Sequence, residues 1–154
     1  MKSPFRFLFH SAANLALLCG LSATAQATEW KLIATSSDLS KITYWYVDPA
    51  SVVVQAHLIQ ARLRTAWSTL QYGPNNTGYQ STTYLNFIDC ERRTIAFTGN
   101  TYFSDVESTG APIYQEDAQP VNTLRFSAVR PGTPGELRVN YLCQSYGTSS
   151  NKVI

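Results

Sequence analysis

Short segments rich in Tyr, Trp, Val, Ile and Thr, bounded by turn-forming residues, recur along this chain. This pattern is typical of strands on a half-buried pleated surface. Segment 41–47 is apolar on both of its alternating faces, which indicates a strand in the interior of a sheet. Segments 81–89 and 94–103 flank a short turn and predict a hairpin. The segments that we predict as strands are residues 30–34, 41–47, 58–72, 81–89 and 94–103.

Segment 58–72 has two interpretations. Leu63, Trp67 and Leu70 fit one stripe of a helix, whereas every second residue from Ile59 to Trp67 fits one face of a strand. We interpret the segment as a strand because the polar residues between these positions would share the opposite face.

A capping box predicts a helix near the C-terminus. Thr133 is suited to the N-cap, Pro134 to the first helical position and Glu136 to the third. The apolar residues between Leu137 and Cys143 also alternate as in a strand, but the cap favours a helix over residues 134–144.

The rest of the C-terminal third is predicted to be mostly irregular. Leu124, Phe126 and Ala128 alternate as a last short strand. Residues 104–120, which are rich in acidic and small residues, predict a long surface loop, and the polar residues 145–154 predict a flexible tail.

The first 27 residues have the features of a secretory leader. A basic start with Lys2 and Arg6 precedes an apolar stretch and an A-x-A cleavage site that ends at Ala27. We therefore expect residues 1–27 to be a signal peptide and residues 28–144 to form one domain, with no transmembrane segment in the mature chain. A lipoprotein acylated at Cys19 is the alternative, but the bulky Leu18 before that cysteine does not suit lipoprotein processing.

The charge of the mature chain argues against binding to nucleic acid. The leader carries two of the twelve basic residues and none of the ten acidic ones, so ten of each remain. A neutral domain without clustered Lys and Arg lacks the electrostatic footprint of nucleic-acid or anionic-lipid binding. We predict neither partner.

Cys90 and Cys143 are the two cysteines of the predicted mature chain. Export places them in an oxidising compartment, where such a pair forms a disulfide. A redox pair would more typically show C-x-x-C spacing, and a metal site needs more ligands than two distant thiols and one histidine. We predict a structural disulfide that fastens the terminal helix to a strand end, and no metal or cofactor.

The sequence offers little support for catalysis. His57 is the single histidine after the leader, and no nucleophile or paired carboxylate stands beside it. Asp48 and Asp89 precede Pro49 and Cys90 and are interpreted as turn and strand-end carboxylates. We predict no catalytic residue and no enzyme activity.

The chain has nine tyrosines and three tryptophans, and all follow the leader. Such side chains are enriched where proteins bind one another, because they bury a large area and keep a polar tip. We expect the three tryptophans to pack in the sheet and four of the tyrosines to be exposed for contact. These residues are Trp30, Trp45 and Trp67, and Tyr44, Tyr46, Tyr102 and Tyr114.

Taken in order, these residues resemble the surface-adhesin protein E-like domains of exported bacterial proteins. The resemblance covers nearly all of the mature chain. Its marks are Trp30, the aromatic strand into Asp48-Pro49-Ala50-Ser51, Trp67 with Tyr72 and Pro74, Tyr79 with Ser81, Asp89-Cys90, and Val129-Arg130-Pro131-Gly132-Thr133 through Glu136 to Cys143.

The resemblance implies an α+β fold, with a curved antiparallel sheet of about six strands and a C-terminal helix disulfide-linked to its concave face. The named member of this family is a surface lipoprotein that binds host matrix and plasma proteins and can dimerise, so the resemblance implies a binding protein of this kind. Leu18 before Cys19 argues against the same lipid anchor in this chain. The binding residues stay unknown, because adhesin contacts do not lie at the shared motif positions.

The leading hypothesis is a noncatalytic binding domain, exported to the periplasm or cell surface of a Gram-negative bacterium, with an unidentified protein partner. A homodimer is left open. The alternative is a periplasmic structural or assembly accessory protein, and a third hypothesis is a small-molecule carrier that uses a cleft between helix and sheet.

Overall fold

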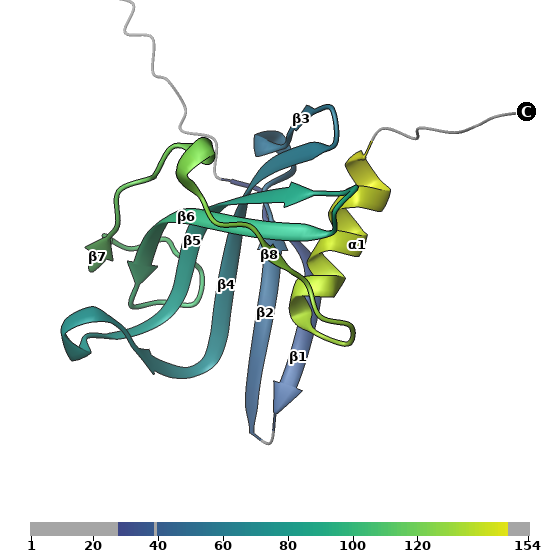
Figure 1. The fold of residues 1–154 in the computed structure, drawn as a ribbon. Helices are drawn as coiled ribbons and strands as arrows, with labels where there is room; N and C mark the ends of the chain where they lie inside the picture. Colours follow the sequence, from purple (N-terminus) through teal and green to yellow (C-terminus); the bar gives the residue numbers. More distant parts are fainter. Residues whose placement is uncertain (1–27, 39, 148–154) are drawn as a thin grey trace, which may run out of the picture.

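The computed structural model describes residues 28–38 and 40–147. The predicted signal peptide 1–27, with Cys19, and residues 148–154 of the predicted tail lie outside the described residues. Within the described part, eight strands form one antiparallel sheet that curls around an α-helix, α1 (Figure 1). The elements are β1 (Lys31–Asp38), β2 (Lys41–Val47), β3 (Val53–Gln55), β4 (Leu58–Tyr72), β5 (Gly78–Asp89), β6 (Thr94–Phe103), β7 (Tyr114–Gln115), β8 (Ser127–Ala128) and α1 (Pro134–Tyr146).

The main path of the sheet confirms most of the predicted strands. Its order is β1-β2-β4-β5-β6-β7, with β3 paired to β4 and β8 paired to β6. As expected, β2 lies inside the sheet between β1 and β4, and β5 and β6 form a hairpin. Segment 58–72 is a strand over its whole length. The predicted curved antiparallel sheet of about six strands is therefore confirmed.

Three parts of the pattern were predicted incompletely. β3 was not expected, and β7 lies inside the predicted loop 104–120, where it pairs with Thr101 and Tyr102 of β6. The last strand is shorter than predicted, because a 3-10 turn at Val121–Thr123 takes Leu124 out of line and leaves only β8 in register with β6. Strands of two or three residues carry too few positions to show a period.

The inner face of the curled sheet carries the hydrophobic core. Alternate residues of β2, β4 and β5 point to this face and pack against α1. The buried core residues are Val47, Ile59, Ala61, Leu63, Tyr84 and Ile88 from the strands and Val139 and Leu142 from the helix. The opposite face, which carries Tyr46 and Arg64, is called the outer face below.

The predicted capping box starts the helix. The Thr133 side chain accepts a hydrogen bond from the Glu136 backbone N–H, and the Glu136 carboxylate accepts one from Gly132 N–H at 2.7 Å. Gly132 has a φ of +73°, a left-handed conformation that a side chain would strain. The helix ends at Tyr146 instead of about Gln144, so the predicted tail begins later than residue 145.

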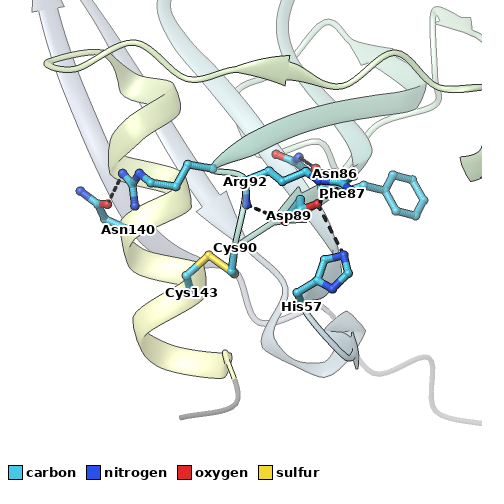
Figure 2. The surroundings of a disulfide bond; sticks show 9 residues. His57, Asn86, Phe87, Asp89, Cys90, Arg92, Asn140 and Cys143 are labelled. Atoms are coloured by element: carbon cyan, nitrogen blue, oxygen red, sulfur yellow. Dashed lines mark hydrogen bonds and ion pairs between the residues drawn. A yellow bond between two sulfur atoms is a disulfide. The ribbon is translucent and has the colours of Figure 1, made fainter. Parts of the chain in front are cut away.

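The disulfide between Cys90 and Cys143 joins the helix to the end of β5 (Figure 2). Cys90 follows the last residue of β5, and Cys143 lies in the last turns of α1. The Cys90 backbone N–H also donates to the His57 carbonyl at 3.0 Å, which fixes the strand end from the other side. The predicted disulfide to the concave face is confirmed.

Removing this disulfide is expected to destabilise the domain strongly. The bridge closes a loop with a sequence separation of 53 residues. Closure of such a loop in the unfolded chain stabilises the fold by about 4 kcal/mol in the chain-entropy model. The double variant Cys90→Ala/Cys143→Ala should therefore unfold at a markedly lower guanidinium concentration than the oxidised parent. The reduced parent is the control, and equal midpoints for the variant and the oxidised parent would contradict the prediction.

Candidate functional site

Along the neighbouring strands β2, β4 and β5, the inner face changes from mainly aliphatic residues at one end to aromatic and hydroxyl residues at the other. In β4, Ile59, Ala61 and Leu63 lie in the core, whereas Thr65 and Trp67, next on the same face, do not belong to it. In β2 the core residue Val47 is followed on the same face by Trp45 and Thr43. In β5 the core residues Ile88 and Tyr84, with the buried Asn86 between them, are followed by Thr82. The aliphatic half lies under α1, and the aromatic and hydroxyl half continues beyond it.

This second half of the inner face forms an open groove of about 560 Å³, called the aromatic groove below. Pro134 and Arg138 of α1 line one side of it. Its aromatic lining is Trp45, Trp67, Tyr79, Tyr84, Phe97 and Tyr102. Its polar lining from the strands is Ser36, Thr43, Thr65, Thr82 and Asn100.

Three of the aromatic rings form a continuous row across β4, β5 and β6. The ring centres of Trp67 and Tyr79 are 5.4 Å apart, and those of Tyr79 and Tyr102 are 5.0 Å apart, both with perpendicular planes. Tyr114 of β7 extends the row from Tyr102 at 5.6 Å. Edge-to-face pairs of this kind each stabilise by about 0.5–1.5 kcal/mol beyond area burial, so the row is a rigid wall.

The hydroxyl of Tyr84 joins the strands to the helix at the bottom of the groove. It lies 3.0 Å from the Thr65 hydroxyl and accepts a hydrogen bond from Arg138 Nη1 at 3.0 Å. Arg138 Nε donates to the Pro134 carbonyl at 3.3 Å. The guanidinium is therefore held in one orientation beside the aromatic rings.

The aromatic residues named from the sequence divide between the two faces. Tyr114 is exposed as expected, whereas Tyr44, Tyr46 and Tyr102 are half-buried. Tyr102 lines the groove, and Tyr44 and Tyr46 belong to the outer face. Of the tryptophans, Trp45 is buried as expected, but Trp67 is half-buried in the groove. Sequence reasoning did not select Tyr79, Tyr84, Phe97 or Arg138. The sequence signal that could have indicated the groove is the change from aliphatic residues to Thr65 and Trp67 along one face of β4.

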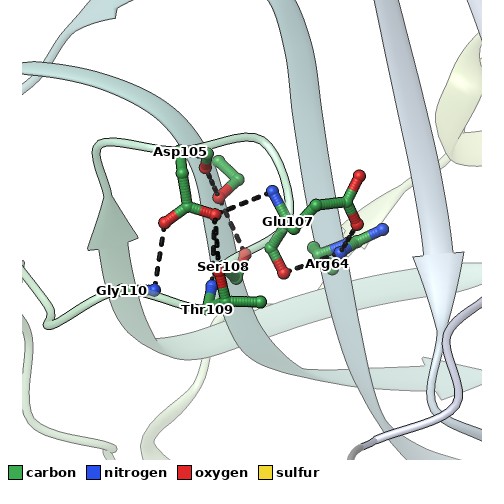
Figure 3. A network of polar contacts seen from close by, with 7 residues as sticks. Arg64, Asp105, Glu107, Ser108, Thr109 and Gly110 are labelled. Carbon is green, nitrogen blue, oxygen red and sulfur yellow. Dashed lines mark hydrogen bonds and ion pairs between the residues drawn. The ribbon is translucent and has the colours of Figure 1, made fainter.

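Arg64 binds a loop to the outer face (Figure 3). Its side chain is only 4% exposed, stacks on Tyr46 with the guanidinium carbon 4.1 Å from the ring centre, and donates to the carbonyl and carboxylate of Glu107 at 2.8 and 2.9 Å. The sequence predicted no role for Arg64. Neither its burial nor its distant partner has a local signal.

Asp105 shapes the same loop. Burial disfavours its charged form, but hydrogen bonds from the backbone N–H groups of Thr109, Gly110 and Glu107 outweigh this effect and lower the pKa of Asp105. Part of the predicted loop 104–120 is thus an ordered turn, held on the sheet by Arg64 and by the buried Ser81.

The acidic residues and the histidine that were weighed for catalysis lie in turns or at a strand end: Asp48 and His57 are turn residues, and Asp89 is the last residue of β5. Asp48 accepts a hydrogen bond from Ala50 N–H at 3.0 Å, and Asp89 accepts one from Arg92 N–H at 2.9 Å. His57 lies in the turn between β3 and β4, with Nε2 3.5 Å from the Asp89 carboxylate (Figure 2). It borders a cleft of about 310 Å³ that is also lined by the disulfide.

No group of three or more His, Cys, Asp and Glu side chains within residues 28–38 and 40–147 is arranged to hold a metal ion. No helix in that part of the chain combines the length and the hydrophobicity that crossing a membrane requires.

Tyr102 should give the groove a distinct alkaline titration. Burial and the charge of Glu116, which accepts a hydrogen bond from the Tyr102 hydroxyl at 3.2 Å, raise the pKa of Tyr102 from 10.0 to about 12. Because the folded state favours the neutral phenol, this stabilisation is complete below pH 10 and is lost as the pH rises to about 12. The tyrosinate absorbance of Tyr102→Phe subtracted from that of the parent should isolate this late step. A difference centred at the ordinary tyrosine pKa would contradict it.

Comparison with known proteins identifies the family. A family model described as "Surface-adhesin protein E" matches residues 30–144. No curated protein sequence matches the chain.

Solved structures of Haemophilus influenzae protein E share the fold. One is 13% identical with a TM-score of 0.57, and the match covers 82% of this chain and 96% of that one. Its crystal form II is 12% identical with a TM-score of 0.54, covering 67% and 82%. At these identities the likeness shows the fold alone, whereas the family model spans most of the described residues. This chain belongs to the surface-adhesin protein E family.

Proposed function

We propose that this chain is a noncatalytic, exported binding domain that contacts a partner protein through the aromatic groove. The partner we infer is a host matrix or plasma protein, in line with the adhesin family to which the chain belongs. The observation that carries the proposal is the row of Trp67, Tyr79 and Tyr102 along an open groove.

Physical properties of the groove support this role. Tyr and Trp are the side chains most enriched among residues that dominate binding energy, because they bury large areas at a small cost in side-chain entropy. Here edge-to-face packing already orders the rings before a partner arrives, which reduces the entropy lost on binding.

Local structural roles of the titratable candidates support a noncatalytic domain. Asp48 and Asp89 each accept a hydrogen bond from a turn N–H, and His57 sits between the carboxylates of Asp89 and Glu91 at 3.5 and 3.8 Å. None of these three residues lines the aromatic groove.

Location on the Gram-negative cell surface follows from the adhesin family, and a periplasmic accessory protein is the competing proposal. We propose that the mature protein begins at Thr28 after cleavage of residues 1–27 and that residues 28–144 form the binding domain. This proposal is compatible with a homodimer.

Truncating the aromatic row should abolish partner binding. Trp67→Ala is expected to weaken binding to a panel of immobilised matrix and plasma proteins by at least about tenfold, the loss typical of an interface hot spot. Tyr44→Ala, on the outer face, is the matched control and should bind like the parent. Binding would be measured by surface plasmon resonance on variants whose circular dichroism matches the parent. Equal loss in both variants, or in neither, would count against the groove.

Surface location can be tested on whole cells. If the domain is displayed outside, protease added to intact cells should degrade it as fast as protease added after the outer membrane is ruptured. A periplasmic marker protein that stays intact until rupture is the control. Degradation only after rupture would reject the adhesin and favour the periplasmic accessory protein.

A further inference from the structure

Arg138 is a charged side chain in the aromatic groove without a counter-charge. It is half-buried, and its two hydrogen bonds go to neutral oxygens, the Tyr84 hydroxyl and the Pro134 carbonyl. Among the described residues, no Asp or Glu lines the groove and no carboxylate forms an ion pair with Arg138. A guanidinium removed from water is normally paired, and its fork of donors matches a carboxylate.

Arg64 on the outer face is a buried arginine whose partner comes from the chain itself, and it serves as a comparison for Arg138. The Arg64 guanidinium donates to the carboxylate and the carbonyl of Glu107, a residue of the loop that packs on this face. Arg138 has no such partner, although it too contacts a tyrosine, through the Tyr84 hydroxyl. The contrast indicates that an anionic group comes to Arg138 from outside the described chain.

Hydroxyl groups in the groove also lack partners. Thr82 is only 6% exposed, and no described residue makes a hydrogen bond with its hydroxyl. Ser36 and Thr43 line the same groove without side-chain hydrogen bonds to described residues. Because a hydroxyl both donates and accepts, these three groups suit a ligand that carries hydroxyls itself.

The apolar part of the lining is aromatic. Pro134 is the single aliphatic residue among those that line the groove, so pockets for Leu, Ile or Val side chains of a peptide are lacking. An aromatic face carries partial negative charge and attracts the weakly positive C–H groups of a ligand. A sugar ring presents a C–H face for such contact and a rim of hydroxyls for the threonines.

We propose that the aromatic groove binds a carbohydrate that carries a carboxylate, with the sugar ring on the Trp67–Tyr79–Tyr102 row and the carboxylate on Arg138. This inference rests on the proposed function, because it names the part of a host glycoprotein that the groove contacts. A peptide or a neutral sugar is the competing ligand.

Two probes that differ by one acidic sugar test the carboxylate. Sialyllactose and lactose would be titrated into the parent protein, with binding followed by calorimetry and by chemical shifts of the groove residues. The parent should bind sialyllactose at least about tenfold more tightly than lactose, as a charge-assisted hydrogen bond provides. Equal affinities for the two probes would overturn the role of Arg138 without any variant being made.

Two substitutions then locate the contacts. Arg138→Gln should reduce sialyllactose affinity about tenfold and leave lactose affinity unchanged, and Arg138→Lys should restore part of the difference through its charge. Thr82→Val, which keeps the side-chain shape, should weaken both sugars. Tyr44→Phe on the outer face is the control. An Arg138→Gln variant that binds both sugars like the parent would overturn the proposal.

Binding to matrix and plasma proteins distinguishes a failure of this inference from a failure of the proposed function. Matrix and plasma proteins would be tested before and after enzymatic removal of their acidic sugars. If desialylated proteins still bind and Trp67→Ala still abolishes binding, the carbohydrate inference fails and the binding domain stands. If a proline-rich peptide displaces the matrix and plasma proteins from this domain while sialyllactose does not, the ligand is a polypeptide and the carbohydrate inference fails. If no protein or sugar depends on the groove, both proposals fail.

Discussion

The attachment of α1 to one end of the inner face is the constraint on which the rest of this structure depends. Val139 and Leu142 pack on the aliphatic half of that face, and the Cys90–Cys143 bridge holds the helix to the end of β5. The capping box at Thr133 starts the helix where the aromatic half begins. Packing, the disulfide and the cap thus all act on the same helix and place it at one end of the inner face.

A difference in length leaves part of the inner face uncovered and forms the aromatic groove. The 13 residues of α1 span about 20 Å, whereas the 15 residues of β4 extend over about 50 Å when straight. One short helix therefore cannot cover the inner face of the long strands. Beyond it, β2, β4 and β5 carry Thr, Trp and Tyr in place of aliphatic residues. These side chains combine apolar area with polar groups, so the uncovered half of the face tolerates exposure to water and suits contact with a ligand.

Sequence patterns predicted the parts of the fold that local chemistry determines. The long strands, the capping box and the disulfide follow from alternation, from Thr133 and Glu136, and from cysteine count. The pairing of Arg64 with Glu107 joins positions 43 residues apart, and no local pattern could indicate it. The groove was foreseen only as a cleft between helix and sheet. Most of its residues were not, because Tyr84 and Phe97 resemble ordinary strand residues until the end of the helix is known.

The same residue types serve the sheet and the groove, which explains why composition alone could not separate structure from function here. Thr, Tyr and Trp favour strands because they fit a half-buried pleated surface, and they favour binding because they combine apolar area with a polar tip. What separates the two roles is the presence or absence of a covering element. Tyr46 is covered by Arg64 and serves the fold, whereas Tyr102 lines an open groove. Arg64 and Arg138 differ in the same way, since a loop supplies the counter-charge of Arg64, whereas Arg138 donates to the neutral Tyr84 hydroxyl in the open groove.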